Sequence, residues 1–102
     1  FAAGSGRKEI LGAFQDKLVP AMQRFKPELI LVSAGFDSRE NDPLGRFTLT
    51  DNDFADLTRV LLDLAREHTG GRLVSVLEGG YNLDGLASAA ASHVTALSQA
   101  GA

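Results

Sequence analysis

Leu29-Ile30-Leu31-Val32-Ser33-Ala34-Gly35-Phe36-Asp37 decides how this chain folds, because it leads from an apolar run into a glycine and a carboxylate. A later stretch, Leu73-Val74-Ser75-Val76-Leu77-Glu78-Gly79-Gly80-Tyr81-Asn82, has the same design. Runs without polar alternation are typical of strands buried on both faces of a parallel sheet. Ligands of such sheets bind outside the carboxyl ends of the strands. The carboxylate of Asp37 and the phenol of Tyr81 are therefore expected to share one site.

Amphipathic helices are predicted on either side of the first strand. From Arg7 to about Phe25, apolar residues recur at spacings of three and four. Pro20 lies inside this stretch and predicts a kink or a break, because proline removes a helical hydrogen bond. The next helix is expected to start at Thr50, where Asp53 completes a capping box, and to end at Gly70-Gly71.

A last helix is predicted from about Leu83 to Leu97, with these residues inward: Leu83, Leu86, Ala90, Val94 and Leu97. The order helix-strand-helix-strand-helix indicates an α/β fold whose two strands are parallel. A sheet of two strands leaves both edges open and is marginal in water. We therefore expect residues 1–102 to be part of a larger domain and to self-associate when isolated.

Composition narrows the classes of function. The 102 residues carry a net charge of −3 and no cysteine, which excludes disulfides and thiolate metal sites. No basic patch suggests nucleic-acid binding, and no apolar stretch approaches the roughly 18–20 residues of a membrane span. A cytoplasmic location is the expectation. The sequence begins with Phe1 rather than methionine, so we expect it to belong to a longer chain.

Each candidate residue also has an ordinary structural interpretation. Asp37 follows a strand, where aspartate often caps a turn, and Asp42 precedes Pro43 in a common turn signal. The segment from Glu78 to Tyr81 is consistent with a strand-to-helix turn, with Asn82 or Asp84 capping the helix. Two histidines, His68 and His93, are expected to be structural or surface groups.

Together, these segments closely resemble the C-terminal part of the histone deacetylase family, which includes bacterial acetylpolyamine amidohydrolases and acetoin-utilisation-type proteins. The likeness is carried by Pro27 to Asp37, by Asp42-Pro43-Leu44-Gly45 and by Leu77 to Leu83. The variants Ala-Gly-Phe-Asp and Glu-Gly-Gly-Tyr are more similar to class II and bacterial members than to class I. The resemblance implies a zinc-dependent amidohydrolase with an arginase-like, three-layer α/β domain.

Two residues take chemical roles through this resemblance. Asp37 matches an aspartate ligand of the zinc ion, and Tyr81 matches the tyrosine that hydrogen-bonds the substrate carbonyl and then the oxyanion. Zinc lowers the pKa of its bound water toward about 7, which makes hydroxide available at neutral pH. An aimed donor such as a phenol can contribute on the order of 3–4 kcal/mol to the transition state.

The remaining matches concern the substrate channel. Leu44 matches an apolar wall of the channel, and Gly79 and Gly80 match glycines whose backbone lines it closely. Asp42 and Pro43 are expected to shape the same loop. The implied substrate is an acetylated lysine or another acetylated amine.

The chain also departs from the family pattern. It lacks the Asp-x-His zinc motif and the paired histidines, since neither His68 nor His93 lies in a corresponding place. Catalytic zinc generally has three protein ligands, so one carboxylate does not make a selective site. We therefore expect an inactive chain, without stoichiometric zinc, that needs the N-terminal part of its domain. Two alternatives stay open, namely an acetylpolyamine or other small-molecule amidohydrolase and a non-catalytic module for packing or self-association.

Overall fold

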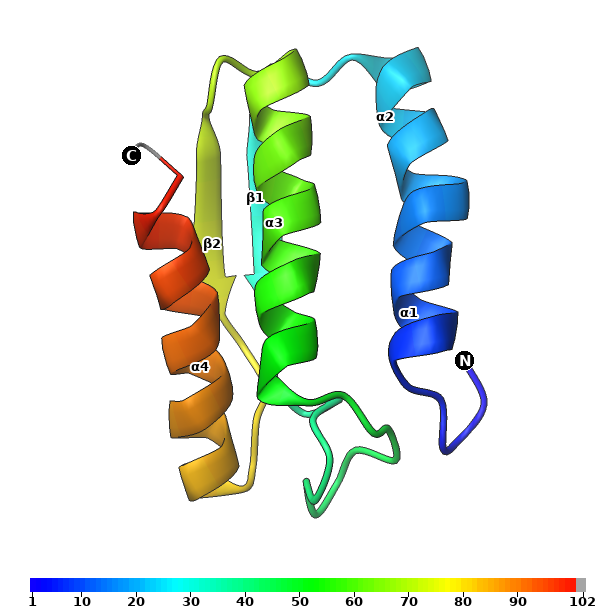
Figure 1. Cartoon of the computed structure of the whole chain (residues 1–102), viewed down its shortest axis with the longest axis vertical. Helices are drawn as coiled ribbons and strands as arrows, with labels where there is room; N and C mark the ends of the chain where they lie inside the picture. Colours follow the sequence, from blue (N-terminus) through cyan, green and yellow to red (C-terminus); the bar gives the residue numbers. More distant parts are fainter. Residues whose placement is uncertain (101–102) are drawn as a thin grey trace.

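A computed structural model describes residues 1–100, and in it helices pack on one side of a two-stranded parallel sheet (Figure 1). The elements follow the chain in this order: α1 (Arg7–Ala13), a π-helical turn η1 (Phe14–Leu18), α2 (Val19–Phe25), β1 (Ile30–Ala34), α3 (Asp51–His68), β2 (Leu73–Leu77) and α4 (Leu83–Ser98). β1 and β2 pair from Ile30 opposite Leu73 to Ala34 opposite Leu77. The predicted α/β class and the parallel pairing are confirmed.

The first helix is continuous where a kink or a break is predicted. α1, η1 and α2 follow one another without interruption, and Pro20 lies in the first turn of α2. Proline has no N–H, and its ring crowds the carbonyl of the residue four positions earlier. The wide π turn at Phe14–Leu18 spreads the carbonyls just before Pro20, so the chain accommodates the ring without leaving the helix.

Local signals place both ends of α3 correctly. The Thr50 hydroxyl accepts a hydrogen bond from the Asp53 N–H at 3.2 Å, and the Asp53 carboxylate accepts one from the Thr50 N–H at 2.9 Å. This is the predicted capping box. After the helix, Gly70 and Gly71 have φ values of 63° and 87°, which glycine adopts without steric cost. The predicted stop at Gly70-Gly71 is therefore confirmed.

The inward face predicted for α4 is partly wrong. Leu83 and Val94 are 79% and 58% exposed, whereas Ala89 and Ala96 are 0% and 2% exposed. α3 and α4 pack against each other over many positions, and small side chains let their backbones approach closely. Ala90, Val94 and Leu97 instead line a groove between α4 and the sheet, together with Ser75 and Leu77 of β2.

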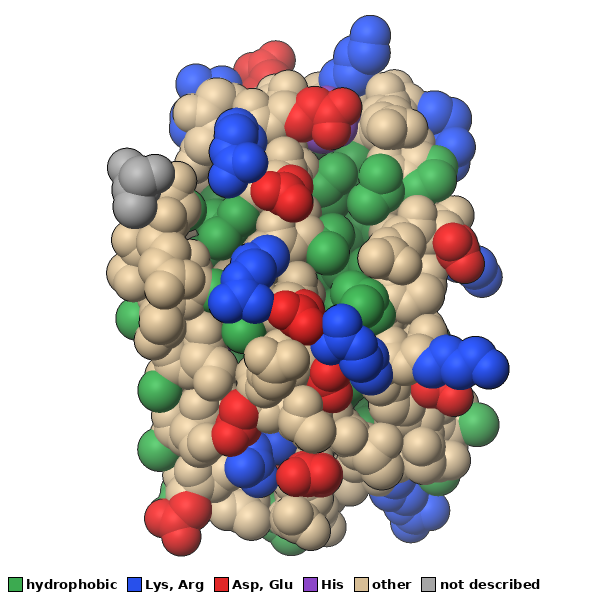
Figure 2. All heavy atoms as spheres, in the orientation of Figure 1, with side chains coloured by type: hydrophobic (Ala, Val, Ile, Leu, Met, Phe, Trp, Pro, Cys, Tyr) green, Lys and Arg blue, Asp and Glu red, His purple; other side chains and the backbone are tan. Residues whose placement is uncertain are grey.

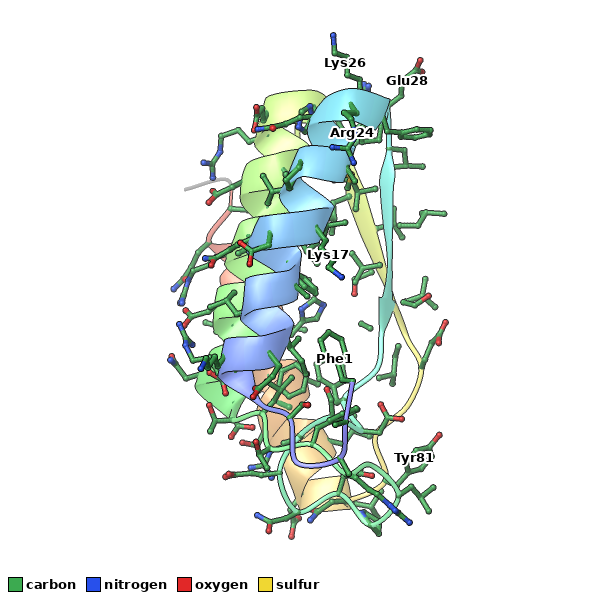
Figure 3. All side chains as sticks on the ribbon, turned by 90° about the vertical axis from the view of Figure 1, so that its right-hand side faces the viewer. Phe1, Lys17, Arg24, Lys26, Glu28 and Tyr81 are labelled. Carbon is green, nitrogen blue, oxygen red and sulfur yellow. The ribbon has the colours of Figure 1, made fainter. Side chains whose placement is uncertain are left out.

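The two faces of the molecule differ in chemistry. On the helix face, Figure 2 shows acidic and basic side chains over the middle of the view, flanked by seams of hydrophobic side chains. Asp56 on α3 forms ion pairs of 2.7 Å with Arg7 and with Arg59. On the opposite side of the sheet no helix lies over the strands (Figure 3), and Leu31 and Val76 are 70% and 55% exposed. Within residues 1–100, only one face of the sheet is therefore covered.

Candidate active site at the carboxyl ends of the strands

Backbone hydrogen bonds carry the pairing of β1 and β2 into the loops that follow them. The Glu78 N–H donates to the Ala34 carbonyl at 3.0 Å, and the Phe36 N–H donates to the Gly79 carbonyl at 2.8 Å. Phe36 is itself buried against Phe54, with ring centroids 5.1 Å apart. The loop that carries Asp37 and the loop that carries Tyr81 therefore leave the sheet side by side.

Asp37 lies against glycines from both loops. A Cβ added to Gly79 would stand 2.9 Å from Asp37 Oδ2, and one added to Gly35 would stand 3.2 Å from Asp37 Oδ1. A Cβ on Gly45 would overlap the Asp37 carbonyl oxygen. Gly35 is not among the residues with positive φ, so its glycine leaves space for the carboxylate and does not serve a left-handed backbone turn. The half-buried carboxylate of Asp37 thus occupies space left by the missing side chains of Gly35 and Gly79.

Asp42 joins the two loops through both oxygens of its carboxylate. Oδ2 accepts hydrogen bonds from the N–H groups of Leu44 at 2.9 Å and Gly45 at 2.8 Å. Oδ1 accepts one from the Tyr81 N–H at 2.8 Å. Desolvation raises the pKa of Asp42, but backbone N–H donors from both loops outweigh it, so this pKa lies below its ordinary value. The ionised carboxylate is the form that these donors stabilise.

The backbone of Tyr81 is held, whereas its side chain extends outward. Tyr81 is 51% exposed, and Figure 3 shows it reaching away from the helices at the lower end of the molecule. Gly80 before it has a φ of 135°, and a Cβ there would stand 2.8 Å from Leu86 Cδ1. Within the described residues, no hydrogen bond joins the phenol to Asp37 or to any other group.

Leu44 and Pro43 lie at the exposed tip of the loop from β1. Leu44 is 69% exposed, and Pro43 is also exposed. The structure therefore brings together Asp37 with Gly79, and Asp42 with Tyr81. The side chain of Leu44 and the phenol of Tyr81 are both exposed and so remain accessible to a ligand.

The residues that the structure describes do not form a metal site by themselves. Within residues 1–100, no three side chains of His, Cys, Asp or Glu lie close enough together to hold a metal ion. Among these residues, Asp37 therefore does not belong to a set of three ligands such as a catalytic zinc ion requires. In the same part of the chain, no helix has the length and hydrophobicity needed to cross a membrane.

His93 is a buried structural group. It is 7% exposed, and its Nδ1 and Nε2 lie 2.7 Å from Thr58 Oγ1 and 2.8 Å from Ser75 Oγ. The Thr58 hydroxyl donates its hydrogen to the Phe54 carbonyl at 2.6 Å, so it accepts from His93 Nδ1–H, and Ser75 donates to Nε2. Desolvation lowers the pKa of His93 and favours its neutral form, whose tautomer is set by these two hydroxyls. The structural interpretation of His93 agrees with this geometry.

Sequence reasoning missed the anchor of the long loop. Arg39 donates from Nε and Nη2 to the two carboxylate oxygens of Asp51, at 2.7 Å and 3.3 Å. The Arg39 hydrogen bond, opposed by desolvation and aided by Ser88, lowers the pKa of Asp51. Gly85 in α4 leaves the space for this arginine, since a Cβ there would stand 2.9 Å from Arg39 Nη1. An isolated glycine inside a predicted helix was the one signal of this close approach.

Comparison with known proteins agrees with the motifs at this edge of the sheet. The family description "Histone deacetylase domain" matches residues 1–97. "Histone deacetylase 14, chloroplastic" from Arabidopsis thaliana is 45% identical over 94 residues, which are 92% of this chain and 22% of that protein. "Histone deacetylase-like amidohydrolase" from Pseudomonas aeruginosa is 44% identical over 78% of this chain and 21% of its own length. "Polyamine deacetylase HDAC10" from Mus musculus is 47% identical over 92% of this chain and 14% of its own.

A solved structure shares the fold. "Crystal Structure of HDA15 HD domain" superposes with a TM-score of 0.86 and 35% identity, over 94% of this chain and 26% of that one. The chain thus spans about a seventh to a quarter of the length of such relatives, and the two-layer arrangement corresponds to part of the deacetylase fold. With a family match over nearly all of its residues, the chain belongs to the histone deacetylase family.

Proposed function

We propose that this chain forms part of the active site of a zinc-dependent deacetylase, which hydrolyses an N-acetyl or related acyl amide to an amine and a carboxylate. The observation that carries the proposal is the hydrogen bond from Phe36 N–H to the Gly79 carbonyl. It joins the loops of Asp37 and Tyr81 at the ligand-binding end of a parallel sheet, in a chain of this family.

Tyr81 is the group proposed to act on the substrate. Its phenol has no intramolecular hydrogen bond within the described residues and is half exposed, so its O–H is free to donate to a carbonyl oxygen from outside the chain. That donor stabilises negative charge as the oxygen becomes an oxyanion. Because the charge is larger in the transition state than in the substrate, this interaction raises kcat more than it improves binding.

Asp37 is proposed as one carboxylate ligand of the zinc ion. The described residues do not complete the site, so the other ligands and the acid/base groups are proposed to lie in further residues of the same protein. The relatives are about four to seven times longer than the matched region, which leaves room for such residues.

The rest of the domain is proposed to cover the bare side of the sheet. Leu31, Val74 and Val76 are 70%, 49% and 55% exposed there, while ion pairs such as Asp56–Arg59 lie on the helix face. Exposed apolar surface of this kind marks an interaction site. Residues 1–102 are accordingly proposed to be a C-terminal part of a larger deacetylase domain, and the isolated chain is proposed to be inactive.

We propose two possible classes of substrate. The names of two relatives specify a histone deacetylase and a polyamine deacetylase, at 45% and 47% identity. Both classes present an acyl amide on a narrow alkyl arm, which the exposed Leu44 is proposed to contact. Acetyl-lysine in a protein is the first proposal, and an acetylated polyamine is the second.

The test uses the full-length protein that contains this chain. Hydrolysis of an acetyl-lysine peptide and of an acetylpolyamine is compared for wild type and Tyr81→Phe, together with zinc content. The substitution should lower turnover roughly 10²–10³-fold and leave zinc content unchanged, because it removes only the donor. Wild-type turnover in Tyr81→Phe would remove the tyrosine from the mechanism. Absence of hydrolysis in the wild type with every acyl amide tried would support the non-catalytic packing module instead.

A further inference from the structure

Two hydrogen bonds connect the loop after β2, which carries Tyr81, to the loop after β1. The Tyr81 N–H donates to Asp42 Oδ1 at 2.8 Å, and the side-chain amide of the next residue, Asn82, donates to the Asn41 carbonyl at 3.1 Å. We call this pair of cross-loop bonds the Tyr81 clamp. It links residues that are about forty positions apart in the sequence, so local turn geometry does not account for it.

Asp42 is fixed at its own end of the clamp. Its second oxygen accepts from two N–H groups, those of Leu44 and Gly45, so both oxygens of the carboxylate have backbone donors. The preceding residue, Asn41, has a φ of 66°, a left-handed conformation that asparagine tolerates better than most residues. This turn directs the Asn41 carbonyl and the Asp42 carboxylate toward the same segment.

Asn82 is fixed at the other end. Its Oδ1 accepts from the Gly85 N–H at 3.0 Å and so caps α4, while its Nδ2 donates to the Asn41 carbonyl. Only one orientation of the amide satisfies both partners, because the helix offers a donor and the carbonyl an acceptor. The segment that carries Tyr81 is thereby fastened to α4 on one side and to the loop of Asp37 on the other.

From this geometry we infer that Asp42 and Asn82 are positioning residues, which hold the backbone of Tyr81 so that its phenol reaches the substrate oxygen. The inference rests on the proposed function of Tyr81. With the backbone held, only the side-chain torsions of the tyrosine remain free, and less conformational entropy is lost when the donor reaches the oxyanion. The clamp therefore affects turnover and leaves the metal ligand in place.

Asp42→Asn tests the first half of the clamp in the full-length protein. The amide keeps the shape of the carboxylate but has one acceptor oxygen instead of two, so at least one of its N–H partners is left without an acceptor. We expect kcat to fall roughly 10- to 100-fold, with KM and zinc content near wild type. We also expect the Tyr81 amide proton to exchange faster with solvent than in the wild type.

A double-mutant cycle shows whether Asp42 acts through Tyr81. In the Tyr81→Phe background, Asp42→Asn should have little further effect on kcat, because the donor that it positions is already gone. An Asp42→Asn effect of equal size in both backgrounds, or no effect in either, overturns the inference. Loss of the proposed function has a different signature, since Tyr81→Phe alone would then leave turnover unchanged.

Asn82→Asp tests the second half. Aspartate keeps the oxygen that caps α4 but has no N–H to donate to the Asn41 carbonyl. The expected result is a lower kcat with a Tm equal to or above that of wild type. Unchanged kcat in Asn82→Asp, with a lower kcat only in Asn82→Ala, would assign Asn82 to the helix cap alone and contradict its positioning role.

The matched control is Asp53→Asn. Asp53 also accepts a backbone N–H, that of Thr50 at 2.9 Å, and it pairs with Arg7, but it makes no hydrogen bond to the four residues of the clamp. This variant should lower Tm while its kcat and the exchange rate of the Tyr81 amide stay near wild type. A fall in kcat as large as that of Asp42→Asn would mean that general destabilisation explains both.

Discussion

The carboxylate of Asp37 rests on the α-carbon of Gly79, so that a methyl group added to this glycine would stand 2.9 Å from Oδ2 and 3.0 Å from Cγ. Gly79 comes from the loop after β2, whereas Asp37 comes from the loop after β1. The place of the proposed zinc ligand is therefore set by the second strand as well as by its own. An alanine at position 79 would push directly on that ligand.

Gly79→Ala should weaken zinc binding by the full-length protein. We expect a fall in zinc affinity of roughly 10- to 100-fold, the range seen when a group that orients a metal ligand is altered. Competition with a chelator measures it. Gly12→Ala is the control, because a Cβ at Gly12 has nothing within 4 Å. Equal zinc affinity in the two variants would show that the Gly79 contact does not position the ligand.

Asp37→Ala should have a larger effect on the same measurement, since it deletes one proposed ligand outright. Activity should fall together with zinc occupancy and recover partly when zinc is added in excess. Metal content at limiting zinc, followed by a zinc titration of activity, provides the test. Full occupancy of the variant at limiting zinc would show that Asp37 does not bind the metal.

His93 should make the stability of the fold depend on pH. Its folded pKa is lowered by desolvation, so below the unfolded value of about 6.5 the unfolded state binds a proton that the folded state does not. The stability that His93 contributes is therefore present above pH 6.5 and is lost as the pH falls toward its folded pKa. Between pH 7 and pH 5, Tm should decline more steeply for wild type than for His93→Gln. Parallel curves for the two proteins would contradict this, because the carboxylates titrate in both.

The bare sheet face should make the isolated chain self-associate. Leu31 and Val74 are paired neighbours on that face and are 70% and 49% exposed, and exposed edges and apolar faces both favour pairing with another chain. Light scattering at micromolar concentration should show a dimer or a larger assembly, and Leu31→Lys should shift it toward the monomer. Leu83→Lys on α4, at a position that is 79% exposed, should not. A monomeric wild-type chain would refute the prediction.

Sequence reasoning succeeded where the signal is local. Thr50 with Asp53, and Gly70-Gly71, involve hydrogen bonds or φ values within a few residues, and the structure shows them as predicted. It was less successful where a neighbouring element decides. Helical periodicity alone predicted that Val94 points inward. In the structure the small side chain of Ala89 is buried instead, and Val94 is exposed beside the groove next to β2.

Some residues of the candidate site could likewise be predicted from the sequence, whereas the contacts between its loops could not. Asp37 and Tyr81 could be chosen because each follows an apolar strand, and strand ends of a parallel sheet meet at one edge. The bond between Asp42 and Tyr81, and the anchor between Arg39 and Asp51, could not be anticipated. Both join side chains whose proximity depends on how a long loop folds back, and periodicity carries no information on that path.

The parallel pairing of β1 and β2 also has a consequence for the order in which we expect the elements to fold. All of α3 lies between the two strands in the sequence, and parallel strands cannot be joined by a tight turn. Ile30 of β1 is buried with Leu64 and Ala65 of α3, so we expect α3 to dock on β1 before the contact with β2 becomes stable. A truncating substitution at Leu64 should accordingly lower the folding rate. One at the exposed Val76 of β2 should leave the folding rate nearly unchanged.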